Sequence, residues 1–281
     1  MGLCYRLEDY AVYREAVGEA TYVDITRRSD PARVPAAWSN LGEVAARYGA
    51  PWVVQIWTKD VGGVLALGGE LLARLRGEGT TVTAQVTATG LAGSAWEPLV
   101  PVDTTSRLGD LARALGAPAH ITWRYDPIIP TVHSPDRFAR LAHQVARHGV
   151  TRGVINFLAP PGRYRRVDRR LAALLPGWSA GMPGYDAAWK ECTARELVDL
   201  AAAEGICLGC CAESSGLAKR VPGLRSAACG DAAWFAHLSG RLPSPARHRG
   251  SRPGCGCLRY FDVGNYGAWL RCHQCVYCYA G

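Results

Sequence analysis

The chain has 281 residues, of which 48% are hydrophobic, so it can bury a large core as one domain or as one domain with a short appendage. No apolar run reaches the length that a membrane span requires, and we expect no membrane association. The net charge of +8 suits an anionic partner, but lysine is rare and the arginines are spread along the chain, so we do not expect nucleic-acid binding.

Short β-rich runs alternate with amphipathic helical patterns along the chain. The runs predict six strands, at 22–26, 53–58, 82–89, 120–125, 153–158 and 206–211. The patterns between them predict helices at 36–48, 66–76, 107–115, 135–148 and 194–204. Ser134 before Pro135 has the pattern of an N-cap, and Thr193 with Glu196 has the spacing of a capping box.

Six consecutive β-then-α units require parallel strands joined by right-handed crossovers. No glycine-rich phosphate loop follows the first strand, and polar residues stand at the carboxyl end of nearly every strand. Because that end carries the chemistry in β/α barrels, the pattern favours an α/β fold with a partial parallel (β/α) barrel of about six units. We expect residues 1–240 to form this barrel and 241–281 to form a cysteine-rich tail packed over its mouth.

The polar strand-end residues are the candidate site. The groups that we expect to take part in catalysis are Lys59, Arg124, Asp126 and Glu213. The groups that we expect to bind substrate are Arg27, Arg28, Asp30, Trp57, Trp123 and Tyr125. Structural roles stay open for them, because the cations can pair with neighbouring carboxylates and the tryptophans can line the barrel rim. Arg124 and Asp126 are two residues apart on one strand, so they point the same way.

The eleven cysteines are expected to serve metal or redox chemistry. The first twenty residues carry charges throughout and lack the apolar core of a secretion signal, which predicts a cytoplasmic protein with reduced thiols. Disulfides are therefore the weaker alternative. Two thiols within the sixth strand run are expected to be buried structural residues, namely Cys207 and Cys210.

Five cysteines fall in the last 27 residues, as C-x-C followed by C-x-x-C-x-x-C. Three thiols in the second motif can ligate three irons of a 4Fe–4S cluster and leave one iron open. We therefore expect Cys272, Cys275 and Cys278 to be the ligands of this cluster. A second, fully ligated cluster would take Cys211, Cys229, Cys255 and Cys257. Whether there is one cluster or two stays open. Zinc is the alternative, although two separated C-x-x-C pairs are its usual site.

Nine short motifs carry a family resemblance. They are TRRSD at 26–30, IWTKD at 56–60, WEPLVP at 96–101, WRYDPII at 123–129, CAE at 211–213, CGD at 229–231, CGC at 255–257, DVGNY at 262–266 and CVYCYA at 275–280. Together they resemble the domain of unknown function 1848 family over nearly the whole chain. The resemblance implies the fold and a metal cluster, but no particular substrate.

The tail is also similar to the cluster loop of radical S-adenosylmethionine enzymes of the spore-photoproduct-lyase type, which read C-x-x-x-C-x-x-C followed by tyrosine. Here Tyr279 follows Cys278, the first gap is one residue shorter, and the loop stands at the carboxyl end of the chain. This similarity implies S-adenosylmethionine as a cofactor on the open iron. It also implies an electron donor such as a ferredoxin or a flavodoxin as a partner.

These observations predict an iron–sulfur enzyme, an oxidoreductase or a lyase, that acts on a small polar or anionic molecule at the barrel mouth. Three kinds of chemistry stay open: reductive cleavage of S-adenosylmethionine, Lewis-acid catalysis at the open iron, and sulfur transfer. Two other classes remain. One is a cluster-bearing redox or nucleic-acid-binding protein without catalysis, and the other is a zinc-stabilised barrel that acts as a hydrolase or a binding module.

Overall fold

The computed structural model describes residues 5–178, 185–211, 216–246, 256–264, 266 and 272–279. Within these ranges, eight parallel strands form one sheet in the order β7-β6-β5-β4-β3-β2-β1-β8. Their bounds are β1 (Tyr22–Ile25), β2 (Val53–Thr58), β3 (Thr81–Thr87), β4 (Ile121–Ile128), β5 (Arg152–Phe157), β6 (Cys207–Cys211), β7 (Arg225–Ala227) and β8 (Phe261–Asp262). Neighbours in the sheet follow one another in the chain, apart from β1 and β8, which is the strand order of a partial β/α barrel.

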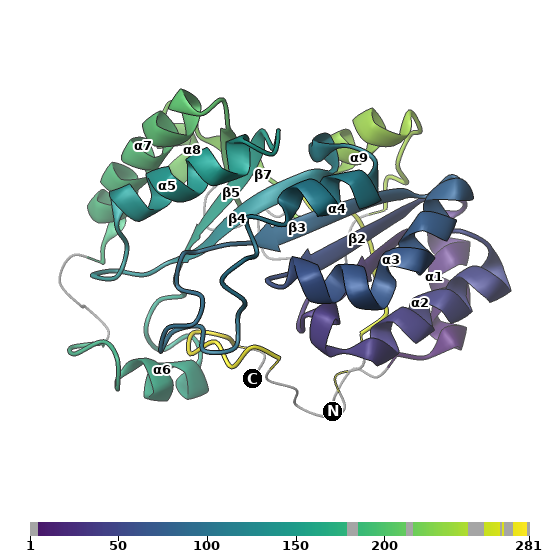
Figure 1. The fold of residues 1–281 in the computed structure, drawn as a ribbon, viewed down its shortest axis with the longest axis horizontal. Helices are drawn as coiled ribbons and strands as arrows, with labels where there is room; N and C mark the ends of the chain where they lie inside the picture. Colours follow the sequence, from purple (N-terminus) through teal and green to yellow (C-terminus); the bar gives the residue numbers. More distant parts are fainter. Residues whose placement is uncertain are drawn as a thin grey trace.

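Most of the helices cover the outer face of this sheet (Figure 1). The helices of the described ranges are α1 (Leu7–Val17), α2 (Pro35–Tyr48), α3 (Val61–Gly77), α4 (Leu108–Leu115), α5 (Pro135–Ala146), α6 (Arg165–Leu171), α7 (Ala187–Ala203), α8 (Leu217–Arg220) and α9 (Ala232–Ser239). Two short 3-10 turns are η1 (Pro31–Arg33) and η2 (Pro118–His120). In Figure 1, α6 lies apart from the other helices, beside the yellow C-terminal segment. No helix in the described ranges has the length and apolar character needed to cross a bilayer.

The six expected strands and five expected helices are all present, and the parallel barrel architecture is confirmed. The N-cap at Ser134 is also confirmed, because its hydroxyl accepts the backbone N–H of Arg137 at 3.3 Å. The capping box predicted at Thr193 was wrong. Asp186 is the N-cap of α7, and its carboxylate accepts the backbone N–H of Trp189. Thr193 lies inside the helix.

The two strands that were not expected, β7 and β8, stand at the two edges of the sheet. They have three and two residues, which is too short to show an alternating pattern in the sequence. The described residues therefore form more strands than the six units predicted. Because β8 lies beyond residue 240, the tail segment contributes to the sheet as well as to the barrel mouth.

Alternation along the strands gives the sheet an apolar outer face and a polar inner face. On β4, the rings of Trp123 and Tyr125 each lie 5.0 Å from the Phe138 ring of α5. The side chains between them point to the inner face. Buried polar residues that line this inner face, each at most 5% exposed, are Asp24, Gln55, Gln85 and Arg124.

The sheet is rolled, because segments from its two halves meet at the inner face. Cys229 follows β7 at one edge, yet its carbonyl oxygen accepts hydrogen bonds from Gln55 of β2 at 2.9 Å and from Gln85 of β3 at 3.4 Å. At the amino ends of the strands, Phe235 of α9 packs edge-on against Tyr22 and fills the interior. The carboxyl ends form the other mouth of the barrel.

Candidate active site

Residues 272–279, called here the C-terminal loop, lie against the loops that follow β1 and β3. The backbone N–H of Leu99 donates to the carbonyl oxygen of His273 at 3.4 Å. The imidazole of His273 is 1% exposed, with Nδ1 3.0 Å from the carbonyl oxygen of Leu99 and Nε2 2.8 Å from Oδ2 of Asp30. These contacts hold the C-x-x-C-x-x-C motif at the mouth of the barrel.

The role expected for Asp30 needs correction, because its carboxylate is a buried structural acceptor and not a substrate contact. In addition to His273, it accepts the hydroxyl of Thr58 at 2.9 Å and the backbone N–H groups of Lys59 at 2.6 Å and Ala32 at 3.0 Å. The residue is 4% exposed. With these donors its oxygens are satisfied, and it joins two strand ends to the C-terminal loop.

Lys59 and Glu97 form a buried ion pair, with 2.9 Å between Nζ and Oε1. The same Oε1 accepts the hydroxyl of Thr89 at 2.8 Å and the phenol of Tyr277 in the C-terminal loop. Burial alone would raise the pKa of Glu97, but the Lys59 charge and the hydrogen bonds from Tyr277, Lys59 and Thr89 outweigh it and lower that pKa. Glu97 was not among the expected site residues, because strand-end position does not select a residue within the loop after β3; its place in the WEPLVP motif at 96–101 was the signal that could have identified it.

The three thiols of the C-terminal loop lie next to this pair. Burial raises the pKa of Cys275 to about 12, although the Lys59 ammonium acts in the opposite direction. Burial raises the pKa of Cys272 as well, and the charge of Cys278 opposes ionisation of both. Without a cation Cys272 and Cys275 therefore resist ionisation, whereas a soft metal centre would remove that opposition.

Two desolvated arginines meet at the aromatic face of Trp57. The guanidinium carbons of Arg27 and Arg124 each lie 5.2 Å from the Trp57 ring. Arg27 pairs with Asp24, and Arg124 pairs with Asp126 on the same strand, as the spacing of the latter two allowed. Both arginines are thus charge-paired and held in the mouth of the barrel.

The remaining expected residues do not all reach this mouth. Trp123 and Tyr125 were expected to contact substrate, but they pack on the outer face against Phe138, where the alternation of β4 places them. Arg28 is exposed, and its guanidinium lies 5.6 Å from the ring of Tyr266. Two expected residues lie outside the described ranges: Glu213 and Cys255.

A second group of thiols lies at the inner end of β6. The Sγ atoms of Cys211 and Cys229 are 3.3 Å apart, and the Sγ atom of Cys257 accepts the backbone N–H of Gly230, the residue after Cys229, at 3.5 Å. In the part of the chain that the structure describes, no three His, Cys, Asp or Glu side chains are arranged to hold a metal ion as they stand. Cys211 and Cys229 instead share a thiol–thiol hydrogen bond.

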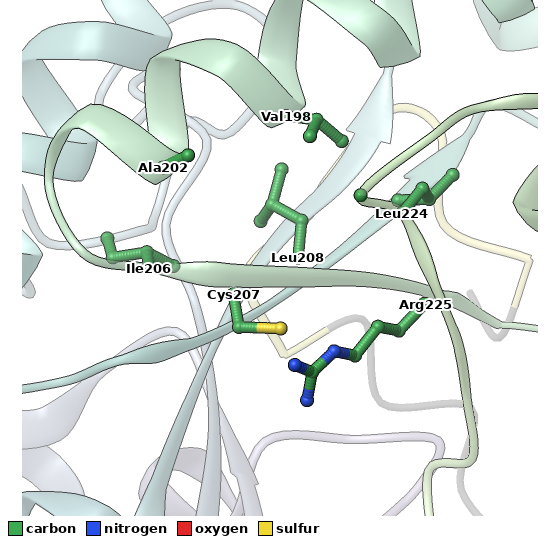
Figure 2. A pocket seen from close by; sticks show the side chains of 8 residues that line it. Val198, Ala202, Ile206, Cys207, Leu208, Leu224 and Arg225 are labelled. Carbon is green, nitrogen blue, oxygen red and sulfur yellow. The ribbon is translucent and has the colours of Figure 1, made fainter.

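A hollow of about 370 Å³ lies away from the barrel mouth, between α7 and the strands β6 and β7. Figure 2 shows the Cys207 thiol and the Arg225 guanidinium on one side of β6 and Leu208 on the other. Cys207 is four residues from Cys211, which is about 13 Å along a strand. The hollow contains none of the expected site residues, and Cys207 offers a matched control for the other thiols.

The chain belongs to the family described as Domain of unknown function (DUF1848), whose model matches residues 33–280. This confirms the resemblance carried by the nine motifs. A comparison with curated proteins finds no match.

Several solved structures share a weak likeness with this chain. An enolase protein from environmental genome sequencing of the Sargasso Sea is 17% identical, with a TM-score of 0.29, covering 82% of this chain and 63% of that one. A dipeptide epimerase from Methylococcus capsulatus is 16% identical, with a TM-score of 0.29 and coverages of 74% and 54%. The carboxyl transferase domain of Rhizobium etli pyruvate carboxylase is 15% identical, with a TM-score of 0.35 and coverages of 83% and 36%. This chain thus spans less than two thirds of each, and none of their properties is transferred to it.

Proposed function

We propose that this protein is an iron–sulfur enzyme whose C-terminal loop holds a 4Fe–4S cluster at the mouth of the barrel and whose strand ends bind a small anionic substrate. The observation that carries the proposal is the position of Cys275. Its thiol is buried, and the ring of Tyr277 in the same loop lies 5.5 Å from the ammonium of Lys59, which directly follows β2, where β/α barrels hold their reacting groups. The C-x-x-C-x-x-C spacing supports a cluster over a zinc ion.

The donor set and its anchoring fit such a cluster. Cys272, Cys275 and Cys278 supply three thiolates from one short loop, which is the number that leaves one iron open. The loop is fixed on both sides of Cys275, through His273 to Asp30 and through Tyr277 to Glu97. When bound, a cluster of this kind supplies an iron with an open position that can pass an electron or polarise an oxygen atom.

The cations of the barrel mouth would bind the negative charge of the substrate. Burial alone would lower the pKa of Lys59, but the Glu97 carboxylate raises it above its ordinary value. Lys59 therefore suits a permanently charged anion ligand better than a general base. Arg124 is likewise kept protonated, since Asp126 raises its pKa against the effect of burial. Trp57, two residues before Lys59, offers a flat surface for a planar substrate.

Asp126 is the carboxylate best placed to accept a proton or a hydrogen bond from the substrate. Its side chain is 29% exposed, compared with 7% for Arg124. The hydrogen bonds from Arg124 and Asn156 both end on Oδ2. In the described ranges no donor contacts Oδ1, so this is the oxygen that a substrate hydroxyl or amine would meet.

The test is addition of S-adenosylmethionine to the anaerobically prepared full chain after reduction with dithionite. Formation of 5′-deoxyadenosine, together with a changed electron paramagnetic resonance spectrum, would support radical chemistry. The Cys275→Ala variant should lose both signals, and the Cys207→Ser control should keep them. A spectrum that S-adenosylmethionine leaves unchanged would reject the radical mechanism and leave Lewis-acid catalysis or sulfur transfer.

A further inference from the structure

Two thiols from separate segments of the chain are in contact inside the barrel. Cys211 ends β6, and Cys229 follows β7 by two residues. Their Sγ atoms lie 3.3 Å apart, whereas the bond of a disulfide is about 2.05 Å long. Both residues are free thiols. The structure therefore shows a cysteine pair in its reduced form.

The main chain holds both cysteines next to each other. Cys211 is the register partner of Ala227 in the β6–β7 pair, and Cys229 lies two residues further along that segment. The carbonyl oxygen of Cys229 accepts the side-chain amides of Gln55 at 2.9 Å and Gln85 at 3.4 Å. Closing the gap between the two sulfur atoms therefore requires movement of side chains and not a change of fold.

The two thiols differ in their exposure to solvent. Cys211 is 8% exposed, whereas Cys229 is only half-buried. Because oxidation of a cysteine requires access to its sulfur atom, an oxidant that enters the barrel would meet Cys229 first. An accessible sulfur in contact with a second, buried thiol is the arrangement of an oxidation-sensitive cysteine beside its resolving cysteine.

The sulfur atom of Cys229 is also a hydrogen-bond partner of Arg124. The guanidinium donates to Sγ of Cys229 at 3.8 Å and to Oε1 of Gln85 at 3.4 Å, and it pairs with Asp126. In a disulfide the sulfur atom of Cys229 would be displaced towards Cys211 and bonded to a second heavy atom. It could then no longer keep the same contact with the guanidinium.

We propose that Cys211 and Cys229 are a redox-active pair that hydrogen peroxide converts into a disulfide, and that this bond weakens the contact between Cys229 and Arg124. First, the Cys229 sulfur attacks the peroxide, the O–O bond breaks, and a sulfenic acid and one water form. The Cys211 sulfur then displaces the sulfenic oxygen as a second water, and the S–S bond forms. The two thiols give up two electrons and two protons, and the peroxide takes them up. A dithiol reductant restores both thiols and becomes a disulfide itself.

The pair lies apart from the C-terminal loop, and its oxidation does not depend on the function proposed above. The consequence for Arg124 does rest on that function, because Arg124 is one of the cations proposed to bind the substrate. Oxidation of the pair would thus alter the anion-binding side of the barrel mouth without a change in the loop cysteines.

The first test treats the anaerobically purified full chain with a small excess of hydrogen peroxide, blocks the remaining thiols and maps the peptides by mass spectrometry. Fragmentation should assign a link between Cys211 and Cys229, and dithiothreitol should remove it. The control Cys207→Ser should form the same link. The absence of a link, or a link in which Cys257 replaces either thiol, would overturn the proposal.

The same mapping in Cys275→Ala separates this proposal from the function proposed above. The variant should contain no iron and should still form the link between Cys211 and Cys229. Iron that stays bound in Cys275→Ala and is released as the link forms would identify the two thiols as cluster ligands and overturn the redox pair.

The second test measures the midpoint potential of the pair in dithiothreitol redox buffers. If Arg124 holds the thiol more firmly than the disulfide, it stabilises the reduced form, so Arg124→Gln should lower the midpoint potential. The matched control is Arg140→Gln, at an exposed position of α5, which should leave the potential unchanged. A wild-type potential in Arg124→Gln would contradict a contact that depends on the oxidation state.

Discussion

His273 and Asp30 are 243 residues apart in the chain, yet His273 Nε2 lies 2.8 Å from Asp30 Oδ2 in a buried position. Asp30 also accepts the backbone N–H of Lys59 at the end of β2. One carboxylate thus connects the loop after β1, the end of β2 and the C-terminal loop. The distance between the loop cysteines and Lys59 depends on this junction.

Replacing His273 with alanine should release the C-terminal loop while the barrel stays folded. The hydrogen bond to the charged carboxylate of Asp30 contributes about 1.5–3 kcal/mol to holding the loop in place. The hydrogen bonds that Asp30 accepts from the barrel remain in the variant. We expect a lower iron content, measured by metal analysis, and an unchanged far-ultraviolet circular dichroism spectrum. The matched control is His237→Ala, at an exposed position of α9. Wild-type iron content in His273→Ala would show that the junction does not position the loop.

Glu97→Gln should be strongly destabilising, because it leaves the Lys59 ammonium buried without a carboxylate. Removing one member of a buried pair costs about 3–5 kcal/mol, whereas replacing both members by uncharged side chains is often nearly neutral. The double variant Lys59→Met/Glu97→Gln should therefore recover much of the free energy of unfolding, measured in urea. A double variant no more stable than Glu97→Gln would mean that Glu97 acts through Tyr277 and Thr89 instead.

Asp262 should make the protein less stable as the pH rises from about 4 to 6. Burial, followed by the charge of Asp24, raises the pKa of Asp262 from its ordinary 3.8 to about 6 in the folded chain. The folded state then holds the proton more tightly than the unfolded state, so the contribution is greatest below pH 3.8 and is lost as the pH passes 6. The loss is about 3 kcal/mol.

The Asp262→Asn variant does not titrate at this position. Its free energy of unfolding, compared with that of the wild type, should therefore gain about 2.4 kcal/mol between pH 4 and pH 7. Urea unfolding of both proteins at these two pH values measures the difference. If the difference in free energy of unfolding between the two proteins is the same at both pH values, the pKa of Asp262 is not raised in the folded protein.

Two adjacent glycines of α3 should respond to alanine in opposite ways. A Cβ at Gly68 would overlap the indole of Trp38 on α2, and overpacking of this kind costs about 1–3 kcal/mol. A Cβ at Gly69 meets no atom, so alanine should stabilise the helix by about 0.5–1 kcal/mol. Thermal unfolding of the two variants checks the sign. Equal melting temperatures would mean that the contact between α2 and α3 adjusts freely.

The periodic part of the fold could be predicted from the sequence because each strand and helix carries its own pattern. β7 and β8 could not, since their pairing depends on the rest of the sheet and not on their own few residues. The start of α7 was missed for a related reason: Thr193 and Glu196 have capping-box spacing, but the chain uses Asp186, which is closer to the start of the helix.

The candidate site was predicted in part. Strand-end position predicted that Lys59 and Arg124 lie at one mouth of the barrel, because the carboxyl ends of parallel strands share an edge. In the structure the ammonium of Lys59 lies 5.5 Å from the ring of Tyr277 in the C-terminal loop. The face of a strand residue was harder to infer, and Trp123 and Tyr125 point outward for that reason. Glu97 lies in a loop, where neither periodicity nor spacing shows which side chain is buried.

Iron and sulfide analysis of the anaerobically purified full chain, together with its visible spectrum, tests the central claim most directly. The account predicts a brown protein with broad visible absorption and about four irons and four sulfides per chain. Both should be lost in Cys275→Ala and retained in Cys207→Ser. A colourless wild-type protein that contains zinc but neither iron nor sulfide would contradict the account.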